Sequence, residues 1–203
     1  MERRFRAYWP DEDEWHWLEL DTEGYAARHV VIRADEPIVA ARLDEVIALR
    51  DGAGLLGVQL YEAVYGVLAE GVVEAPPGAI PVGADEFDRV YRRAVSHRNF
   101  AQPTTGPFPH GSLINGTFGL NPWPSGVTGT YVDIGHDPVH GFVDATWFFR
   151  NQVSWPEPGV EAQFRVVDIR PQTLQLRLEP SSTRHAGSAW PQRYDWPKQG
   201  SGH

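Results

Sequence analysis

The sequence contains no cysteine among its 203 residues. This absence excludes disulfide bonds, thiol nucleophiles and thiolate metal ligands. It agrees with a reducing compartment, and we expect a cytoplasmic protein. Lysine is nearly as rare, because Lys198 is the only one and the other basic residues are arginines.

Long apolar segments are also missing. No segment approaches the roughly 18 consecutive apolar residues that a membrane-spanning helix needs. The first residues, Met1 to Arg6, are mostly charged and have no apolar core of the kind found in secretory signals. We therefore expect no membrane partner and no secretion.

The sequence has no excess of positive charge. It carries 27 acidic and 18 basic residues, which give a formal net charge of −9, and most of the negative charge lies in residues 1–99. Proteins that bind a phosphate backbone usually have a basic stripe. Any phosphate contact must therefore come from a few arginines that folding brings together.

Motifs of catalysis and cofactor binding are absent as well. The sequence has no Gly-x-Ser-x-Gly elbow, no Gly-x-Gly-x-x-Gly fingerprint and no phosphate-binding P-loop. The two histidines of His136-Asp137-Pro138-Val139-His140 flank a proline that favours a loop, and His16 and His29 have no partner pattern. The acidic run Asp11–Glu14 is expected to be a solvated turn. We predict no enzyme, no metal site and no cofactor, and an enzyme that uses the acidic turn remains the weakest alternative.

Residues 1–98 predict an α+β domain, a β-meander followed by helices. Alternating apolar residues indicate the strands, and apolar residues at helical spacing indicate the helices. An Asp-Gly-Ala-Gly segment, residues 51–54, separates the first two helices, and Phe87, Val90, Tyr91 and Ala94 form the apolar face of the third. The expected strands are Arg3–Trp9, Trp15–Leu20, Tyr25–Arg33 and Ile38–Ala41, and the expected first two helices are Leu43–Arg50 and Leu55–Leu68.

Residues 99–110 predict a linker, since they are rich in turn formers and have little periodicity. Residues 181–203 predict a flexible tail, because this polar, Gly/Ser-rich segment buries too little apolar surface to order itself. Residues 111–180 lie between them and form the second predicted domain.

The second domain contains five alternating apolar segments separated by Gly, Pro, Asn and Asp turns. Their number, length and turns predict a small all-β barrel of the oligonucleotide-binding (OB) type. The segments are Ser112–Leu120, Val127–Ile134, Val139–Phe148, Val160–Ile169 and Thr173–Leu178.

These segments resemble the S1 RNA-binding domain in the order of their strands. Gly111–Phe118 is similar to the opening strand of that family, Gly129–Gly135 to the second and Val139–Asp144 to the third; Phe164–Ile169 and Leu174–Leu178 are similar to the last two. The resemblance covers about 70 residues of the sequence and implies an OB barrel that binds RNA. The first domain resembles small actinobacterial domains of unknown function, which implies no activity.

Alternation along the strands sorts the side chains of the barrel by face. Five side chains are expected to gather on its outer surface: Tyr131, His140, Phe142, Arg165 and Arg177. Aromatic rings stack on bases, and guanidinium groups contact phosphates. We therefore predict non-catalytic binding of single-stranded RNA, with Tyr131, His140 and Phe142 as stacking residues.

The sequence departs from the S1 pattern at two positions. Thr128 stands where these domains commonly carry a second aromatic residue, and Asp144 stands at the position of their third-strand histidine. An alternative function therefore stays open, in which the protein is an adaptor, or an immunity protein or inhibitor, whose acidic surface binds a basic protein.

Overall fold

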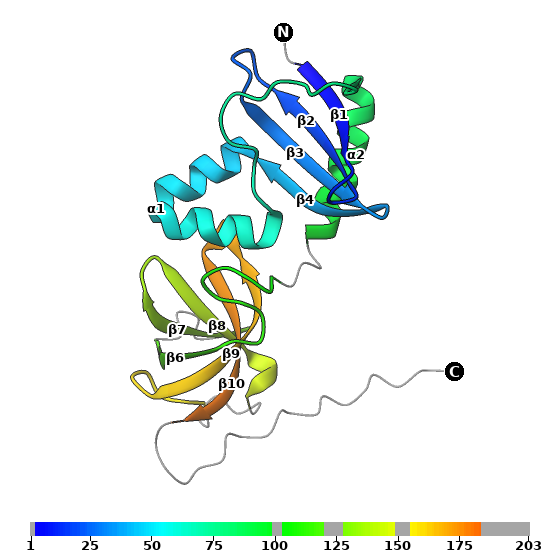
Figure 1. Ribbon diagram of the computed structural model, residues 1–203. Coiled ribbons are helices and arrows are strands. Elements are labelled where there is room, and N and C mark those ends of the chain that lie inside the picture. The colour runs from blue at the N-terminus through cyan, green and yellow to red at the C-terminus, as the bar shows by residue number, and fades with distance from the viewer. Residues whose placement is uncertain (1–2, 99–102, 120–127, 149–154, 184–203) are drawn as a thin grey trace, which may run out of the picture. The chain divides into compact units, whose positions relative to one another are not determined.

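The computed structural model describes residues 3–98, 103–119, 128–148 and 155–183. The chain divides into two compact units, Met1–Pro107 and Phe108–His203. The first is an α+β unit and the second is a closed barrel (Figure 1). The division falls inside the predicted linker, between Pro107 and Phe108, and residues 99–102 of that linker fall outside the described residues.

The first unit is built on one antiparallel sheet with the order β4-β3-β2-β1-β5. Four long strands follow one another as a meander, as the alternation predicts, and β5 adds two residues at the edge beside β1. The strands are β1 Arg3–Trp9, β2 Glu14–Leu20, β3 Ala26–Arg33, β4 Glu36–Arg42 and β5 Ile80–Pro81.

Two helices complete this unit, α1 Leu43–Tyr65 and α2 Ala84–His97. The break predicted at residues 51–54 is a kink inside α1, where Gly54 has a φ of 59° and a ψ of −144°. α1 ends at Tyr65, earlier than predicted, because Gly66 follows with a φ of 81°, a conformation that glycine adopts without strain.

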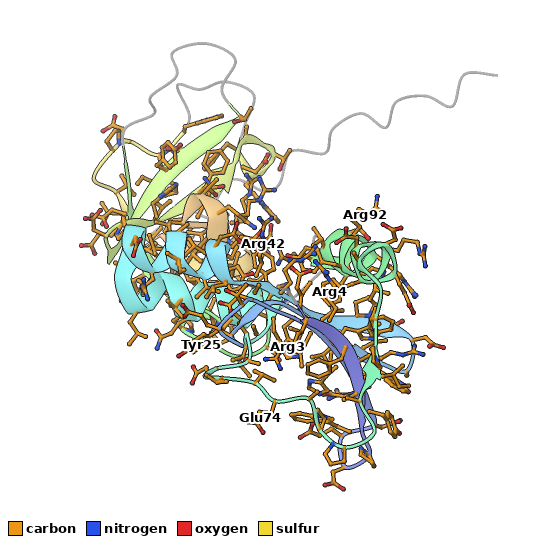
Figure 2. The ribbon with its side chains drawn as sticks, turned by 90° about the horizontal axis from the view of Figure 1, so that it is seen from above. Arg3, Arg4, Tyr25, Arg42, Glu74 and Arg92 are labelled. Atoms are coloured by element: carbon orange, nitrogen blue, oxygen red, sulfur yellow. The ribbon has the colours of Figure 1, made fainter. Side chains whose placement is uncertain are left out.

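α2 covers one face of the sheet, behind the strands in the view of Figure 1. Its buried residues Phe87, Tyr91 and Ala94 lie on the predicted apolar face. They pack with Trp17 and Val30 of the sheet in one core. Arg92 of α2 points away from the sheet (Figure 2).

Five strands form the second unit and close into a barrel with the order β10-β8-β7-β6-β9. β10 pairs in parallel with β8 and antiparallel with β9, and the other pairs are antiparallel. Large side chains such as Phe118, Phe164 and Leu176 are fully buried. The strands are β6 Leu113–Phe118, β7 Gly129–His136, β8 Val139–Asp144, β9 Glu161–Arg170 and β10 Gln175–Thr183.

Each of the five apolar segments predicted in this unit overlaps one strand, with shifted ends. β8 ends at Asp144, because Ala145–Trp147 forms a 3₁₀ turn. The backbone N–H of Thr146 donates a hydrogen bond to the Asp144 side chain at 2.9 Å, which caps the start of this turn. β10 continues to Thr183, so that the first three residues of the predicted tail belong to the barrel. Residues 184–203 lie outside the described residues.

Candidate functional site

Strand pairing brings three of the predicted site residues into one row across the barrel. Tyr131 of β7 is in register with Phe142 of β8, and Phe142 is in register with Arg177 of β10. His140 lies two residues before Phe142 on the same face and is in register with Gln175. We call these five residues, Tyr131, His140, Phe142, Gln175 and Arg177, the aromatic face.

The rings of this face contact one another edge to face. The ring centroids of Tyr131 and His140 are 5.0 Å apart with an angle of 70° between the planes, and those of Tyr131 and Phe142 are 5.7 Å apart at 76°. Such geometry is favourable for aromatic pairs and holds the rings in fixed orientations. Tyr131 and His140 are both half-buried, so part of each side chain remains open to solvent.

Phe142 differs from its prediction, because only 4% of the residue is exposed. Tyr131 contacts it on one side, and the guanidinium of Arg177 lies 4.7 Å from its ring centre on the other. Gly129 makes room for this arrangement, since a Cβ atom at that position would stand 2.5 Å from the Phe142 ring. Phe142 is therefore the floor of the aromatic face and not a free stacking surface.

Arg177 is held by two contacts. Besides its position over Phe142, it donates a hydrogen bond to Oδ2 of Asp144 at 2.6 Å. Both side chains are only partly exposed. The Asp144 carboxylate, which would repel a phosphate if it stood alone, is thus compensated by Arg177, and the pair adds little net charge to the face.

Arg165 does not belong to the row that Tyr131, Phe142 and Arg177 form. It is exposed on β9, in register with Glu179 of β10 and with Leu113 of β6, and it donates to the carbonyl of Gly111 at 3.1 Å. Alternation predicted its outward direction correctly but gave no information on register. Since Glu179 follows Arg177 by two residues on β10, Arg165 lies diagonally across from Arg177 on the outer surface and not in its row.

The first unit holds a polar cluster that sequence reasoning missed. Nδ1 of His16 lies 3.1 Å from Nε2 of His29, and both residues are buried in the sheet. Burial lowers the pKa of His29 to about 4, with His16 as a second cause. Glu14, expected in a solvated turn, is also buried and pairs with Arg33. The one signal in the sequence was the spacing of Glu14 and His16, since residues two apart on a strand point to the same face.

The histidines of the His136–His140 motif do not converge. Asp137 and Pro138 form the two-residue connection between β7 and β8, as the proline predicts, and His136 is exposed at the end of β7. His136 contacts Phe108, at 5.4 Å between ring centroids, whereas His140 contacts Tyr131.

No family model and no curated protein matches the chain. Three solved structures resemble parts of it at low TM-scores. An uncharacterized protein of Methanocaldococcus jannaschii has a TM-score of 0.28 and 14% identity, with 34% of this chain and 88% of that chain covered. GSP13 of Bacillus subtilis has a TM-score of 0.28 and 21% identity, with 36% of this chain and 55% of that chain covered.

The third structure is a multidomain protein with nucleic acid binding domains from Streptococcus pneumoniae, with a TM-score of 0.29, 12% identity, and 89% of this chain and 51% of that chain covered. This chain thus spans about half the length of the latter two proteins. Among the described residues, no helix has both the length and the apolarity that crossing a membrane requires.

Proposed function

We propose that the barrel binds single-stranded nucleic acid, RNA in particular, on the aromatic face, and that it does so without catalysing a reaction. We also infer that the barrel is an OB fold of the S1 kind. Five strands that close in the order β6-β7-β8-β10-β9, with one parallel pair between β8 and β10, support this inference. Neither a metal nor a cofactor is needed for such binding.

One observation carries the proposal: two partly open rings, Tyr131 and His140, stand 5.0 Å apart above a buried aromatic floor. A base that stacks on either ring meets a side chain already fixed by its neighbours, so little conformational entropy is lost. Each such stack contributes about 1–3 kcal/mol in single-strand-binding proteins. Gln175, whose Nε2 atom lies 3.4 Å from Nε2 of His140, adds an amide beside the stacking position.

Charge makes a small contribution in this proposal. Arg177 is shared between Phe142 and Asp144, and Arg165 lies outside the row, beside Glu179, and donates to the Gly111 carbonyl. Each phosphate contact on a single strand changes log K by about 0.7 for each tenfold change in salt. We therefore expect a slope of about −0.7 from one contact, far below that of a basic groove.

Fluorescence anisotropy with a labelled RNA oligomer tests the proposal. The Tyr131→Ala variant should bind about 5- to 150-fold more weakly, because one stack is lost. Tyr131→Phe keeps the ring and should bind like the wild type. Arg177→Ala should weaken binding more than Arg165→Ala, which serves as the matched arginine on the same barrel.

Two results would contradict this function. One is the absence of saturable binding by the folded wild-type chain, and the other is equal binding by Tyr131→Ala and the wild type. Lack of RNA binding together with co-purification of a basic protein would favour the acidic-surface alternative.

A further inference from the structure

The turn between β1 and β2 brings two carboxylates and an imidazole together. One ligand atom from each of Glu12, Glu14 and His16 lies within 4.8 Å of the other two. Glu14 and His16 alternate on β2 and so share a face, while Glu12 reaches them from the turn. This gathering involves the first unit and is separate from the aromatic face of the barrel.

His16 has a nitrogen atom without a hydrogen-bond partner at the centre of this group. Its side chain is only 9% exposed, and its Nε2 atom is buried. The nearest acceptor is Oε2 of Glu14 at 3.4 Å, a contact that does not reach hydrogen-bond geometry. A buried polar atom left without a partner is costly, so this atom points to a ligand between the imidazole and the carboxylates.

Neighbouring residues orient the three side chains. Nδ1 of His16 lies 3.1 Å from Nε2 of His29. Both residues are buried, and this contact fixes the orientation of the His16 ring. If Nδ1 of His16 carries the proton and donates it to His29, the Nε2 lone pair is left free to bind an electrophile. Metal-binding histidines are typically fixed in this way through their second nitrogen.

The carboxylates are fixed as well. Arg33 binds Oε1 of Glu14 and leaves Oε2 facing His16. The hydroxyl of Tyr8 donates to Oδ1 of Asp13 at 2.6 Å, which pins the turn that carries Glu12. Asp13 is thereby engaged, and Glu12 is the turn carboxylate directed at the group.

We propose that Glu12, Glu14 and His16 form a binding site for a divalent transition-metal ion, with zinc as the representative ion. The ligand atoms are a Glu12 oxygen, Oε2 of Glu14 and Nε2 of His16. One imidazole with two carboxylates suits zinc and its neighbours in the first transition row, whereas magnesium and calcium take oxygen ligands. Zinc bonds of about 2.0–2.2 Å require the three atoms to draw closer, and the exposed Glu12 side chain can make that movement.

Calorimetric titration of the full-length protein with Zn²⁺ tests the site. We expect one zinc ion bound in the micromolar range or below. Glu12→Gln should weaken binding at least tenfold, and His16→Asn should abolish it. The matched controls are Glu23→Gln, an exposed acid in the next hairpin turn, and His97→Asn, an exposed histidine on α2; both should bind zinc like the wild type, and excess Mg²⁺ should not compete.

Glu12 is exposed, so its variant keeps the test valid even if His16→Asn folds poorly; circular dichroism of each variant reports that. The proposal is overturned if the wild-type chain binds no zinc, or if Glu12→Gln binds it as tightly as the wild type. Binding unaffected by either variant would assign the zinc to other histidines.

Trp9 offers a second readout. Its ring stacks on His16 at 4.0 Å between centroids and is partly exposed. Co²⁺ at the site should quench the fluorescence of this tryptophan, and the quenching should fall in Trp9→Phe while calorimetric binding persists. Equal quenching in the wild type and Trp9→Phe would place the metal elsewhere and overturn the proposal.

Discussion

Replacing Arg98 should cost the first unit much of its stability. Only 8% of the Arg98 side chain is exposed, although it carries a full charge. Its guanidinium donates to both carboxylate oxygens of Glu45 at 3.2 and 2.9 Å and to the carbonyl of Ala40. It also lies 4.2 Å from the ring centre of Tyr65. One side chain thus joins the end of α2 to α1 and to β4.

The size of the effect follows from these contacts. Breaking a buried ion pair by removing one partner costs about 3–5 kcal/mol. The Glu45 side chain is 31% exposed and can regain water, so the lower end applies. Arg98→Met keeps the apolar stem and should destabilise the unit by about 3 kcal/mol. With a urea m value of about 1.5 kcal/mol/M, the midpoint falls by about 2 M.

The cysteine-free sequence allows an assay that reports on this unit alone. A Val30→Cys reporter in the buried core, present in the reference and in every variant, reacts with a thiol reagent only when the unit unfolds. Labelling against urea concentration gives the midpoint. Arg92→Met, on the exposed side of the same helix, is the matched control and should shift stability by no more than about 0.5 kcal/mol.

Two outcomes would refute the reasoning. One is a midpoint for Arg98→Met that equals the midpoint of Arg92→Met. The other is a double variant, Arg98→Met with Glu45→Gln, that is no more stable than Arg98→Met alone. Removing the unpaired charge should restore about 1 kcal/mol, because contacting residues couple.

Two more variants probe the two units separately. Glu19 is buried; burial alone would raise its pKa, but hydrogen bonds from Arg28 and Arg4 outweigh it and lower the pKa. Glu19 therefore stabilises the folded unit fully at pH values above about 4.3, the pKa of a glutamate in the unfolded chain. This stabilisation is lost as the pH falls through the lower pKa of Glu19 in the folded unit. Glu19→Gln should flatten the acid dependence of urea unfolding. Gly129→Ala should destabilise the barrel by about 1–3 kcal/mol, because its methyl group would collide with the backbone oxygen of Val143 and with the Phe142 ring. The effect is measured as a lower melting temperature.

Each of these two variants has its own control. Glu23→Gln removes an exposed charge from the turn between β2 and β3 and should leave the acid dependence unchanged. An equal flattening in both variants would contradict the role of Glu19. Gly119→Ala adds a methyl group at 3.5 Å from the carbonyl oxygen of Tyr131, an ordinary contact. Equal melting temperatures for the two glycine variants would exclude the collision.

Local pattern predicted most of the secondary structure, because alternation and helical spacing report which side of an element is buried. β1 was predicted at its observed bounds, and the apolar face of α2 was largely correct. Outward directions on β7, β8 and β10 were also correct, since successive side chains in a strand point to opposite faces. Each of these correct predictions depends only on the residue spacing within a single helix or strand.

The failures concern relations between elements. Arg165 of β9 pairs with Glu179 of β10. This register depends on β-bulges, which the alternation of apolar and polar residues does not show. Phe142 points outward, but two neighbours from other strands cover it. His16 gains its partner from β3, and Arg98 gains its partners Glu45 and Ala40 from elements distant in sequence. A single sequence carries no direct record of such contacts.

The parallel pairing of β10 with β8 has a consequence for protein synthesis. β10 is the last strand of the barrel, yet it lies between β8 and β9 and completes both. Until the ribosome releases residues 175–183, the nascent barrel exposes two unpaired strand edges, which are templates for aggregation. The meander of the first unit needs no such late insertion and can fold during translation. Chains that terminate prematurely within β9 should therefore aggregate through the barrel half.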